Sequence, residues 1–470
     1  MTRLIIAGAV MILTAIAICR GEESNGNTVV RLTVHPAPAP SPPLRYELLP
    51  DVMELSPGNP IQGYLKMFVD NHDMFHSNNM PFFYFPERAD DEWFKIPLQQ
   101  LPLDKLKDLD TTPWKMIDTA ARLELPNWQC RFWEWKKYGW GEWKGPLPEV
   151  VLMPDVVGRL QMRIRIQLAD GRLNDAIATA KTLFAICRHL GECPTPFGSH
   201  YGTITGLRIM ESLEEVIQKP ECPNLYWALS SLPIPLVDTH QAIQGDWVLR
   251  PSWMDHVNEK AQMADAALQS VVSEIPGQDD ADKLRARLSA KAADAAYLEA
   301  ARSRLHGSGL NAAVVRQLPA LQVVLLNEIA IRKIARDELV RSMSLPYWQA
   351  SATFAADLAH ANKIADSGVF SADMQTMIKD LHSFWVQQNR LDQRVALLRC
   401  VEAIRLYAAE HNGEFPKQLG DMTVPLPIDP ITGKPPIYEL NESSAAVRGS
   451  SPLGVRDEQY KFSYEISLAK

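Results

Sequence analysis

Residues 160–190 read LQMRIRIQLADGRLNDAIATAKTLFAICRHL, and this stretch decides the expected fold class. Asp170-Gly171 interrupts a long helical pattern, which predicts two helices joined by a tight turn. On the second helix, apolar residues recur at helical spacing and form one face: Leu173, Ile177, Ala180, Phe184 and Cys187. A single apolar face is typical of a helix that packs on a helical core. The sequence therefore predicts a mainly α protein built from helical hairpins.

The helical pattern extends over residues 151–386, which we expect to form an α-helical body. Gly171 followed by Ala176 resembles the middle of a tetratricopeptide hairpin, although no repeat of about 34 residues recurs along the chain. The body is therefore expected to be tetratricopeptide-like without being a repeat array. Further helices are expected at 203–217, 255–274, 279–305, 319–342 and 347–365.

Residues 387–470 are expected to form a small C-terminal α+β domain. The stretch RVALLRCVEAIRLYAAEH (394–411) predicts one helix with an apolar stripe, and QYKFSYEI (459–466) alternates as a half-buried strand does. Asn412-Gly413 is expected to end the helix. The stretch Asp429-Pro430-Ile431-Thr432-Gly433 predicts a turn in which the aspartate accepts backbone N–H bonds. Together these signals predict one helix packed on a small antiparallel sheet.

Composition limits the classes of function. The chain has 470 residues, of which 46% are hydrophobic, and its formal net charge is −8. This is a globular composition, and a chain without a basic excess is not expected to bind nucleic acid. The sequence carries neither a Walker A motif nor a G-x-G-x-x-G motif after a strand, so no cofactor is expected.

The N-terminus predicts export. Residues 1–17 combine Arg3, a long apolar run and an A-x-A pattern at 15–17, as a secretory signal peptide does. The apolar run of roughly 15 residues is shorter than the roughly 20 that span a bilayer. A membrane is therefore expected only through this segment if it stays uncleaved, and Cys19 leaves a lipoprotein alternative open. The protein is expected to be periplasmic or extracellular.

A proline-rich stretch follows the predicted signal peptide. Residues 18–45 contain HPAPAPSPP, in which proline alternates with small residues. This pattern favours an extended polyproline conformation over a helix or a sheet. We therefore expect a linker between the signal peptide and the first folded element.

The chain has six cysteines, and none lies in a C-x-x-C pair or in a zinc-ligand spacing. Three of them, Cys187, Cys193 and Cys222, are close in sequence. Disulfides remain open for an exported protein, but buried free thiols are expected for most of the six.

Two motifs are candidate metal sites. His72 and His76 are four residues apart beside Asp73, which resembles the H-E-x-x-H arrangement of zinc proteases. The aspartate is one methylene shorter than the glutamate of that motif, and no third ligand follows at a known spacing. Asp429 is a candidate for calcium or phosphate binding in its predicted turn. The motif GSHYG (198–202) has histidine where a nucleophile elbow needs serine.

Residues 46–150 are expected to form an irregular, aromatic-rich N-terminal region. Five tryptophans lie close together in it: Trp128, Trp133, Trp135, Trp140 and Trp143. One interpretation is an aromatic platform that binds a sugar or a peptide. The other is that these large rings seal an irregular segment onto the helical body. The stretch LPYWQA (345–350) similarly predicts an aromatic packing wedge at the start of a helix.

The chain resembles an uncharacterised family of exported proteins from planctomycete-type bacteria. The resemblance rests on five stretches: LRYELLPDVMELSPGNP (44–60), RLQMRIRIQLADGRLNDAIATAKTLFAICRHL (159–190), PNLYWALSSLP (223–233), LVRSMSLPYWQA (339–350) and RVALLRCVEAIRLYAAEHNGEFPKQLGDMTVPLPIDPITGKP (394–435). It covers most of residues 44–440. It implies export but brings no activity with it.

The C-terminal unit resembles the globular tail of type II secretion pseudopilins. The matching positions are Asn412, Gly413, Pro416, Asp429, Pro430, Gly433, Pro435 and Tyr438. Pseudopilins have an apolar N-terminal helix leading directly into this unit, whereas the preceding stretch DLHSFWVQQNRLDQR (380–394) is polar here. The resemblance therefore implies the shape of a small domain and not filament assembly.

These observations favour a non-catalytic, exported helical protein that acts by protein–protein interaction in the cell envelope. Its expected partners are envelope or secreted proteins. The sequence favours a non-enzyme over an enzyme because no catalytic set converges in it. Two alternatives stay open: an extracytoplasmic hydrolase or carbohydrate-binding protein, and a component of a secretion or pilus-like system.

Overall fold

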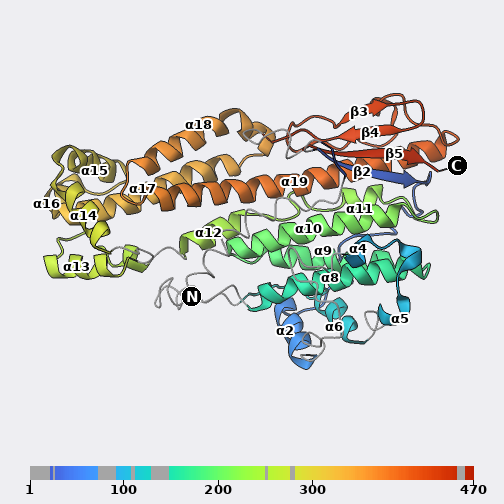
Figure 1. Ribbon diagram of the computed structural model, residues 1–470, viewed down its shortest axis with the longest axis horizontal. Coiled ribbons are helices and arrows are strands. Elements are labelled where there is room, and N and C mark those ends of the chain that lie inside the picture. The colour runs from blue at the N-terminus through green and yellow to red at the C-terminus, as the bar shows by residue number, and fades with distance from the viewer. Residues whose placement is uncertain are drawn as a thin grey trace.

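The computed structural model describes residues 22–24, 27–71, 92–106, 112–128, 148–248, 252–275, 281–452 and 461–469. The protein is mainly helical, with a small sheet formed largely by C-terminal strands, as the sequence predicts. The molecule is elongated, with the sheet at one end and a group of short helices at the other (Figure 1). In the described part of the chain, no helix is long and apolar enough to cross a membrane.

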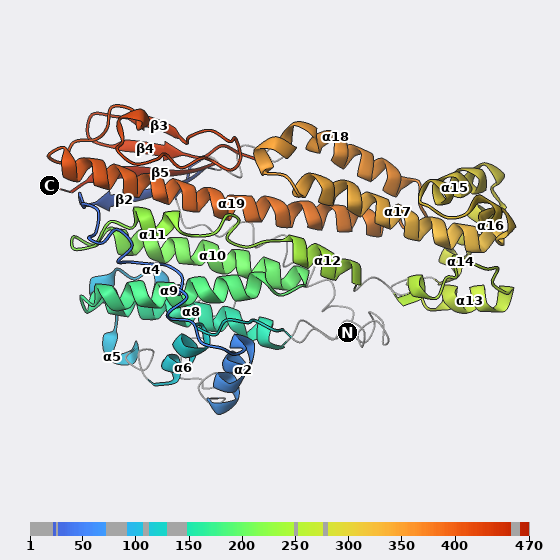
Figure 2. The same cartoon turned by 180° about the vertical axis from the view of Figure 1, so that it is seen from behind.

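The N-terminal elements are short and are followed by three long helices. The short elements are β1 (Glu22–Ser24), β2 (Asn27–Val34), α2 (Pro60–Asp70), α4 (Glu92–Lys95), η3 (Leu98–Gln100), α5 (Leu103–Leu106) and α6 (Thr112–Ala120). The long helices are α8 (Pro148–Ala169), α9 (Leu173–Gly191) and α10 (Pro196–Ile217). Views from both sides show these three helices stacked below α19 (Ser371–Glu410) (Figure 2).

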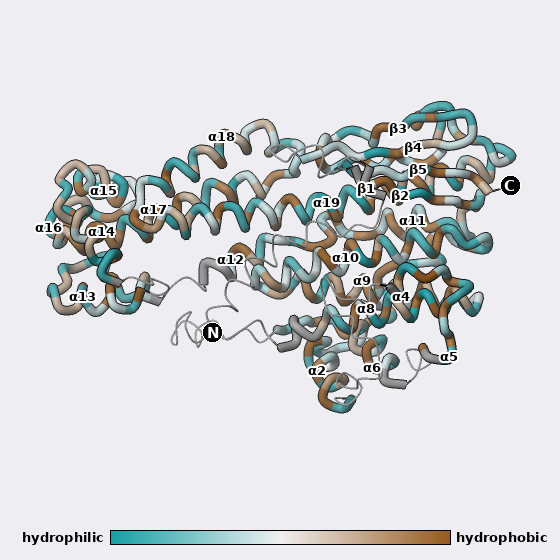
Figure 3. The backbone as a smooth tube through the Cα atoms, in the orientation of Figure 1, coloured by the Kyte–Doolittle hydropathy of each residue, from teal (hydrophilic) through white to brown (hydrophobic). Residues whose placement is uncertain are grey.

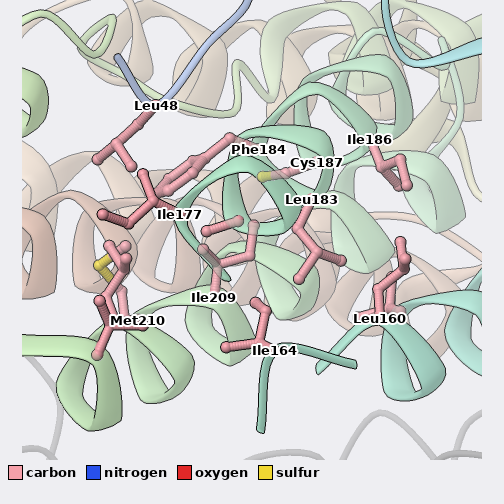
Figure 4. Packing of buried hydrophobic residues seen from close by; sticks show 14 of the residues in the cluster. Leu48, Leu160, Ile164, Ile177, Leu183, Phe184, Ile186, Cys187, Ile209 and Met210 are labelled. Carbon is pink, nitrogen blue, oxygen red and sulfur yellow. The ribbon is translucent and has the colours of Figure 1, made fainter. Parts of the chain in front are cut away.

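The turn between α8 and α9 lies where the sequence predicts it. Gly171 has a φ of 72°, a left-handed conformation that a residue without a β-carbon adopts most easily. The predicted apolar face of α9 is buried, and its side chains meet those of α8 and α10 (Figure 4). Cys187 lies inside this layer as a small apolar group. The helical-hairpin prediction is therefore confirmed for this pair of helices.

The sheet is mixed rather than antiparallel. Its order is β1-β2-β5-β4-β3, with β3 at Ile437–Leu440, β4 at Ala445–Arg448 and β5 at Phe462–Leu468. Strand β2 pairs in parallel with β5, so Leu32 lies opposite Ile466. This strand lies inside the expected linker 18–45. It forms because Leu32 and Val34 point into the core while Arg31 and Thr33 point out, which is the alternation of a half-buried strand.

Helix α19 is the longest element and connects the two ends of the molecule. Its 40 residues span about 60 Å at 1.5 Å per residue. The expected boundary between residues 386 and 387 falls inside this helix, which continues through it without a break. The helix ends as predicted, because Asn412 and Gly413 both have positive φ and Gly413 N–H donates to Ala408 O at 2.8 Å.

The end of the molecule opposite the sheet is a cluster of shorter helices around a separate core, which we call the distal lobe. It contains η5 (Ser252–Asp255), α13 (Asp265–Ser273), α14 (Ala281–Ala293), α15 (Ala295–Gly307), α16 (Ala312–Gln317) and the first half of α17 (Ala320–Met343). Helix α18 (Tyr347–Asp366) then runs back beside α17. Hydrophobic and hydrophilic residues alternate along α17 and α19, as expected for helices with a buried face (Figure 3).

The expected single helix 279–305 is wrong, because the structure divides it into α14 and α15. Asp294 lies between them in an extended conformation, and its side chain accepts a hydrogen bond from Tyr297 N–H. The first N–H groups of a helix have no acceptor within that helix, and an aspartate at the N-cap supplies one from its side chain. Asp294 therefore favours the start of a new helix at this point. The alanine-rich pattern on both sides of Asp294 conceals this break.

Candidate functional site

Several polar side chains converge along the buried side of α19, and the structure assigns them to packing. Arg405 is fully buried and forms an ion pair with Glu402 at 2.7 Å. Its guanidinium also donates to the backbone oxygens of His35 at 2.9 Å and Cys222 at 2.8 Å. Because it contacts three separate segments of the chain, Arg405 joins the N-terminal region and the segment after α10 to the long helix.

A second buried ion pair lies closer to the middle of α19. Arg394 donates three hydrogen bonds to Glu214 of α10, and the same carboxylate accepts a bond from Tyr464 Oη of β5 at 2.5 Å. The Arg394 guanidinium also lies over the Phe462 ring, 4.7 Å from its centroid. These contacts bind α10, α19 and the sheet to one another. A carboxylate held by an arginine and a hydroxyl in a closed core is a structural group.

Asp429 lies in the turn that the sequence predicts, and it is 1% exposed. One carboxylate oxygen accepts Ile431 N–H and the Gln393 side-chain amide, each at 2.9 Å. The other oxygen accepts Ser450 N–H at 2.9 Å. Calcium needs a ring of oxygen ligands, whereas this carboxylate is surrounded by donors. The turn prediction is confirmed, and the contacts give Asp429 a structural role.

The other sequence-predicted site residues fall into two groups. Trp128 is 6% exposed, and its indole N–H donates to His189 O at 2.8 Å, so this ring seals the N-terminal region onto α9. The remaining candidates lie outside the described residues: His72, His76, Trp133, Trp135, Trp140 and Trp143. The zinc site and the aromatic platform therefore stay predictions, because Trp128 is the one residue of these two sites that lies in the described part of the chain.

Three carboxylates near the N-terminal region have the spacing of a metal site. One oxygen from each of Glu47, Asp51 and Glu54 lies within 4.8 Å of the others. The Lys181 ammonium group pairs with Glu54 and lies 3.7 Å from Glu47. An ammonium in this position supplies the positive charge that a metal would otherwise bring, so we interpret the group as an ion-pair cluster.

Four cysteine thiols are described, and all four are buried and free: Cys187, Cys193, Cys222 and Cys400. Burial raises the pKa of Cys222 to about 12 and that of Cys400 to about 12. A thiol with so high a pKa is not a nucleophile at neutral pH. The prediction of buried free thiols is confirmed for these four.

The motif GSHYG lies within α10 and not at a sharp turn. His200 is half-buried, and its Nδ1 lies 3.1 Å from the Gln387 side-chain oxygen of α19. Ser199 lies in the core on the same helix. A nucleophile elbow presents its side chain at an exposed strand-to-helix turn, so this motif does not provide one.

A cavity of about 580 Å³ lies in the distal lobe between α14 and the start of α19. Its lining residues are Arg287, Ala290, Lys291, Gly368, Val369, Phe370, Ser371, Ala372 and Asp373. Two cationic side chains and a helix N-terminus favour an anion, while the Asp373 carboxylate opposes one. The Lys291 ammonium also lies over the Tyr297 ring, 4.6 Å from its centroid. This chemistry suits weak binding and not acid–base catalysis.

Four of the exposed large apolar side chains in the described structure come from just before and at the start of α18, from just before the Asp429 turn and from the start of β3, and we call this set the junction surface. It contains Leu345, Trp348, Ile428 and Ile437, which are 48%, 45%, 58% and 49% exposed. A β-carbon at Gly433 would lie 2.6 Å from the Trp348 ring, so this ring packs on the turn after Asp429. The turn is closed by Asp429 N–H, which donates to Lys434 O at 2.8 Å, and Ile428 precedes it.

Sequence reasoning missed the junction surface because its residues come from distant parts of the chain. The expected packing wedge LPYWQA is correct for Tyr347, which is 3% exposed and packs on Trp385 with ring centroids 4.6 Å apart. Its neighbour Trp348 points outward instead. Adjacent large aromatic residues on one helix cannot both face the core. The Tyr347-Trp348 pair in the sequence therefore indicates that one of the two rings is exposed.

Comparisons with models of protein families, with curated proteins and with solved structures found no match to this chain.

Proposed function

We propose that this protein is an exported, non-catalytic helical protein that acts by protein–protein interaction in the cell envelope. The junction surface is the observation that supports this proposal most directly. Isolated apolar side chains are normal on any protein surface, but a group of large ones, including a tryptophan, indicates an interaction site. The N-terminal sequence pattern, and not the structure, supports export.

The use of the buried polar groups also supports a non-catalytic role. Within the described residues, the convergent sets around Arg405, Arg394 and Asp429 are occupied by contacts between structural elements. A catalytic acid, base or nucleophile needs access to a substrate, and these groups are enclosed in the core. The tetratricopeptide-like character of the α8–α9 hairpin and the pseudopilin-like character of the C-terminal unit remain parts of this proposal.

The interaction is tested by photo-crosslinking in the envelope of cells that produce the protein. A photoreactive amino acid replaces Trp348. The same photoreactive amino acid in place of Met53 is the control, because Met53 is 87% exposed and lies in the N-terminal region. We expect discrete crosslinked protein bands from position 348 and none from position 53.

A substitution then tests whether the apolar side chains carry the binding. Ile437→Glu places a charge on the junction surface without touching the core, and Met53→Glu is the matched control. We expect the first change to reduce the yield of crosslinks from position 348 by at least about tenfold, since burying an unpaired charge in an interface costs roughly 1.4 kcal/mol or more. Equal crosslinking at positions 348 and 53, or no effect of Ile437→Glu, would contradict the proposal.

A further inference from the structure

The segment 231–239 crosses α19 between α11 (Tyr226–Ser230) and α12 (His240–Val248), and two side chains of α19 hold it. The Gln388 side-chain oxygen accepts Thr239 N–H at 3.0 Å and the Thr239 hydroxyl at 2.7 Å. One turn further along the helix, Asp392 accepts Leu236 N–H at 3.0 Å. These bonds lie in the core, since Gln388 and Asp392 are 7% and 8% exposed.

Opening of this segment would uncover apolar surface. Leu236 and Val237 are buried, and Val237 packs against Gly191 at the end of α9. The segment therefore lies between the end of α9 and the α19 side chains that hold it. A change that weakens the hydrogen bonds between the segment and Gln388 or Asp392 therefore increases the exposure of Leu236 and Val237.

Asp392 differs from Glu402, the other buried acid of α19, because no cation is seen to pair with it in the described structure. Its charged or titratable neighbours come from three elements. The Cys187 thiol of α9 interacts with it electrostatically. Arg394, two residues further on, is paired with Glu214 of α10. On the segment itself, Asp238 pairs with His240. On α10, His200 contacts Gln387, which precedes Gln388 on α19.

We propose that Asp392 and the segment 231–239 form a pH-dependent latch, closed while Asp392 is protonated and weakened when it ionises. A neutral carboxyl group still offers an oxygen to Leu236 N–H. An ionised one places an unpaired negative charge in the core, which is costly. Gln388 holds the segment in both states because it does not titrate. This inference does not rest on the proposed function.

The direction of the pH effect follows from the two states of the carboxyl group. Burial raises the pKa of Asp392 to about 7 in the closed state, while the Leu236 hydrogen bond lowers it in part. When the segment opens, the pKa returns toward 3.8, the ordinary value for aspartate. Opening therefore releases a proton between about pH 4 and pH 7. The opening equilibrium constant rises by about 50-fold from pH 5 to pH 7 and by less than about twofold from pH 7 to pH 8.

Hydrogen exchange of the full chain measures this equilibrium. Peptides that cover 231–239 are followed by mass spectrometry at pH 5, 6, 7 and 8, and the rates are corrected for the intrinsic pH dependence of amide exchange. We expect a corrected rise of about 50-fold between pH 5 and pH 7 in the wild-type protein. Peptides from 323–331 of α17, in the distal lobe, are the internal reference and are expected to show a much smaller change.

Two variants sharpen the measurement. Asp392→Asn keeps an oxygen for Leu236 N–H but cannot ionise, so its corrected exchange is expected to be independent of pH. Asp238→Asn removes a carboxylate from the same segment without touching Asp392, and it is expected to keep the wild-type pH dependence.

A wild-type protein whose 231–239 exchange is flat between pH 5 and pH 7 overturns the latch, even if Asp392→Asn fails to fold. A pH dependence that persists in a folded Asp392→Asn protein also overturns it.

Discussion

Buried carboxylates have different hydrogen-bonding partners at the two ends of the molecule. In the sheet-end lobe, which is the core formed by α8 to α10, the sheet and the second half of α19, the buried Glu402 and Glu214 carboxylates each pair with an arginine, Arg405 and Arg394. In the distal lobe, the buried Glu328 carboxylate accepts Val369 N–H at 2.9 Å, Phe370 N–H at 3.2 Å and the Tyr297 hydroxyl at 3.0 Å.

This difference predicts different sensitivities. An arginine that is removed from a closed core leaves a charged carboxylate without its partner, and that is costly. A carboxylate held by neutral donors can lose its charge instead. Burial raises the pKa of Glu328, which favours the neutral form. The sheet-end lobe should therefore be disrupted by single changes of charge, while the distal lobe should tolerate them.

The largest effect is expected for Arg405→Met. The change removes the partner of Glu402 and three backbone contacts in a fully enclosed site. We expect the free energy of unfolding of the sheet-end lobe to fall by about 3–5 kcal/mol, measured by urea denaturation. Arg31→Met is the control, since its pair with Glu465 is on the surface and is worth less than about 1 kcal/mol. Similar losses in both variants would contradict the contrast between buried and exposed pairs.

A smaller effect is expected for Gly202→Ala in the sheet-end lobe. The added β-carbon would lie 2.9 Å from Gly191 N and 3.1 Å from Cys187 O, and backbone atoms cannot rotate away. Overpacking of this kind costs about 1–3 kcal/mol. Gly307→Ala in the distal lobe is the matched control, because nothing lies within 4 Å of its β-carbon position. The comparison would fail if thermal melting showed equal shifts for the two alanines.

Acid is expected to weaken the sheet-end lobe through His189. Burial lowers the pKa of His189 to about 3, and its Nδ1 lies 2.8 Å from the Tyr64 hydroxyl oxygen. Because the unfolded imidazole has its ordinary pKa of 6.5, unfolding takes up a proton between pH 6.5 and about 3. Stability is therefore lost as the pH falls through this window, by about 1.4 kcal/mol at pH 5.5.

His189→Gln isolates this contribution. Asp392 acts in the opposite direction, so the informative quantity is the difference between wild type and variant and not the wild-type profile alone. Urea titrations at pH 7.5 and pH 5.5 measure it. If the variant loses as much stability on acidification as the wild-type protein does, His189 is not the group that titrates.

The smallest effect is expected for Glu328→Gln in the distal lobe. The amide keeps one oxygen acceptor but turns an NH₂ group toward one former donor, so about one hydrogen bond is lost, worth about 1 kcal/mol. Hydrogen exchange of peptides from α14 to α17 reports on this lobe, with the exposed Glu299→Gln as the neutral control. A loss as large as that of Arg405→Met would remove the proposed difference between the two lobes.

The regular helices could be predicted because their apolar periodicity is local. The expected helices at 319–342 and 347–365 agree with α17 and α18 to within about a residue. The C-terminal strand could be predicted for the same reason, since Phe462, Tyr464 and Ile466 recur at every second position and are buried, while Glu465 is exposed. Periodicity needs no knowledge of the partner element.

Elements that depend on a distant partner could not be predicted in this way. Strand β2 looks like part of a proline-rich linker until β5 lies beside it. The first half of α19 is polar in sequence, and one side of it is buried because α17 and α18 pack against it. The Asp429 turn could be read from its residues, but its contacts with Gln393 and Ser450 come from other elements.

The pairing of β2 with β5 has a consequence for biogenesis. Arg31 of β2 and Glu465 of β5 form an ion pair across 434 residues of sequence. A ribosome or a translocation channel delivers a chain from its N-terminus, so β2 emerges long before its central partner exists. Contacts of such high contact order form slowly, and an unpaired strand can associate with other chains meanwhile. The sheet is therefore expected to be the last part to assemble, and the early chain is the form that most needs a chaperone.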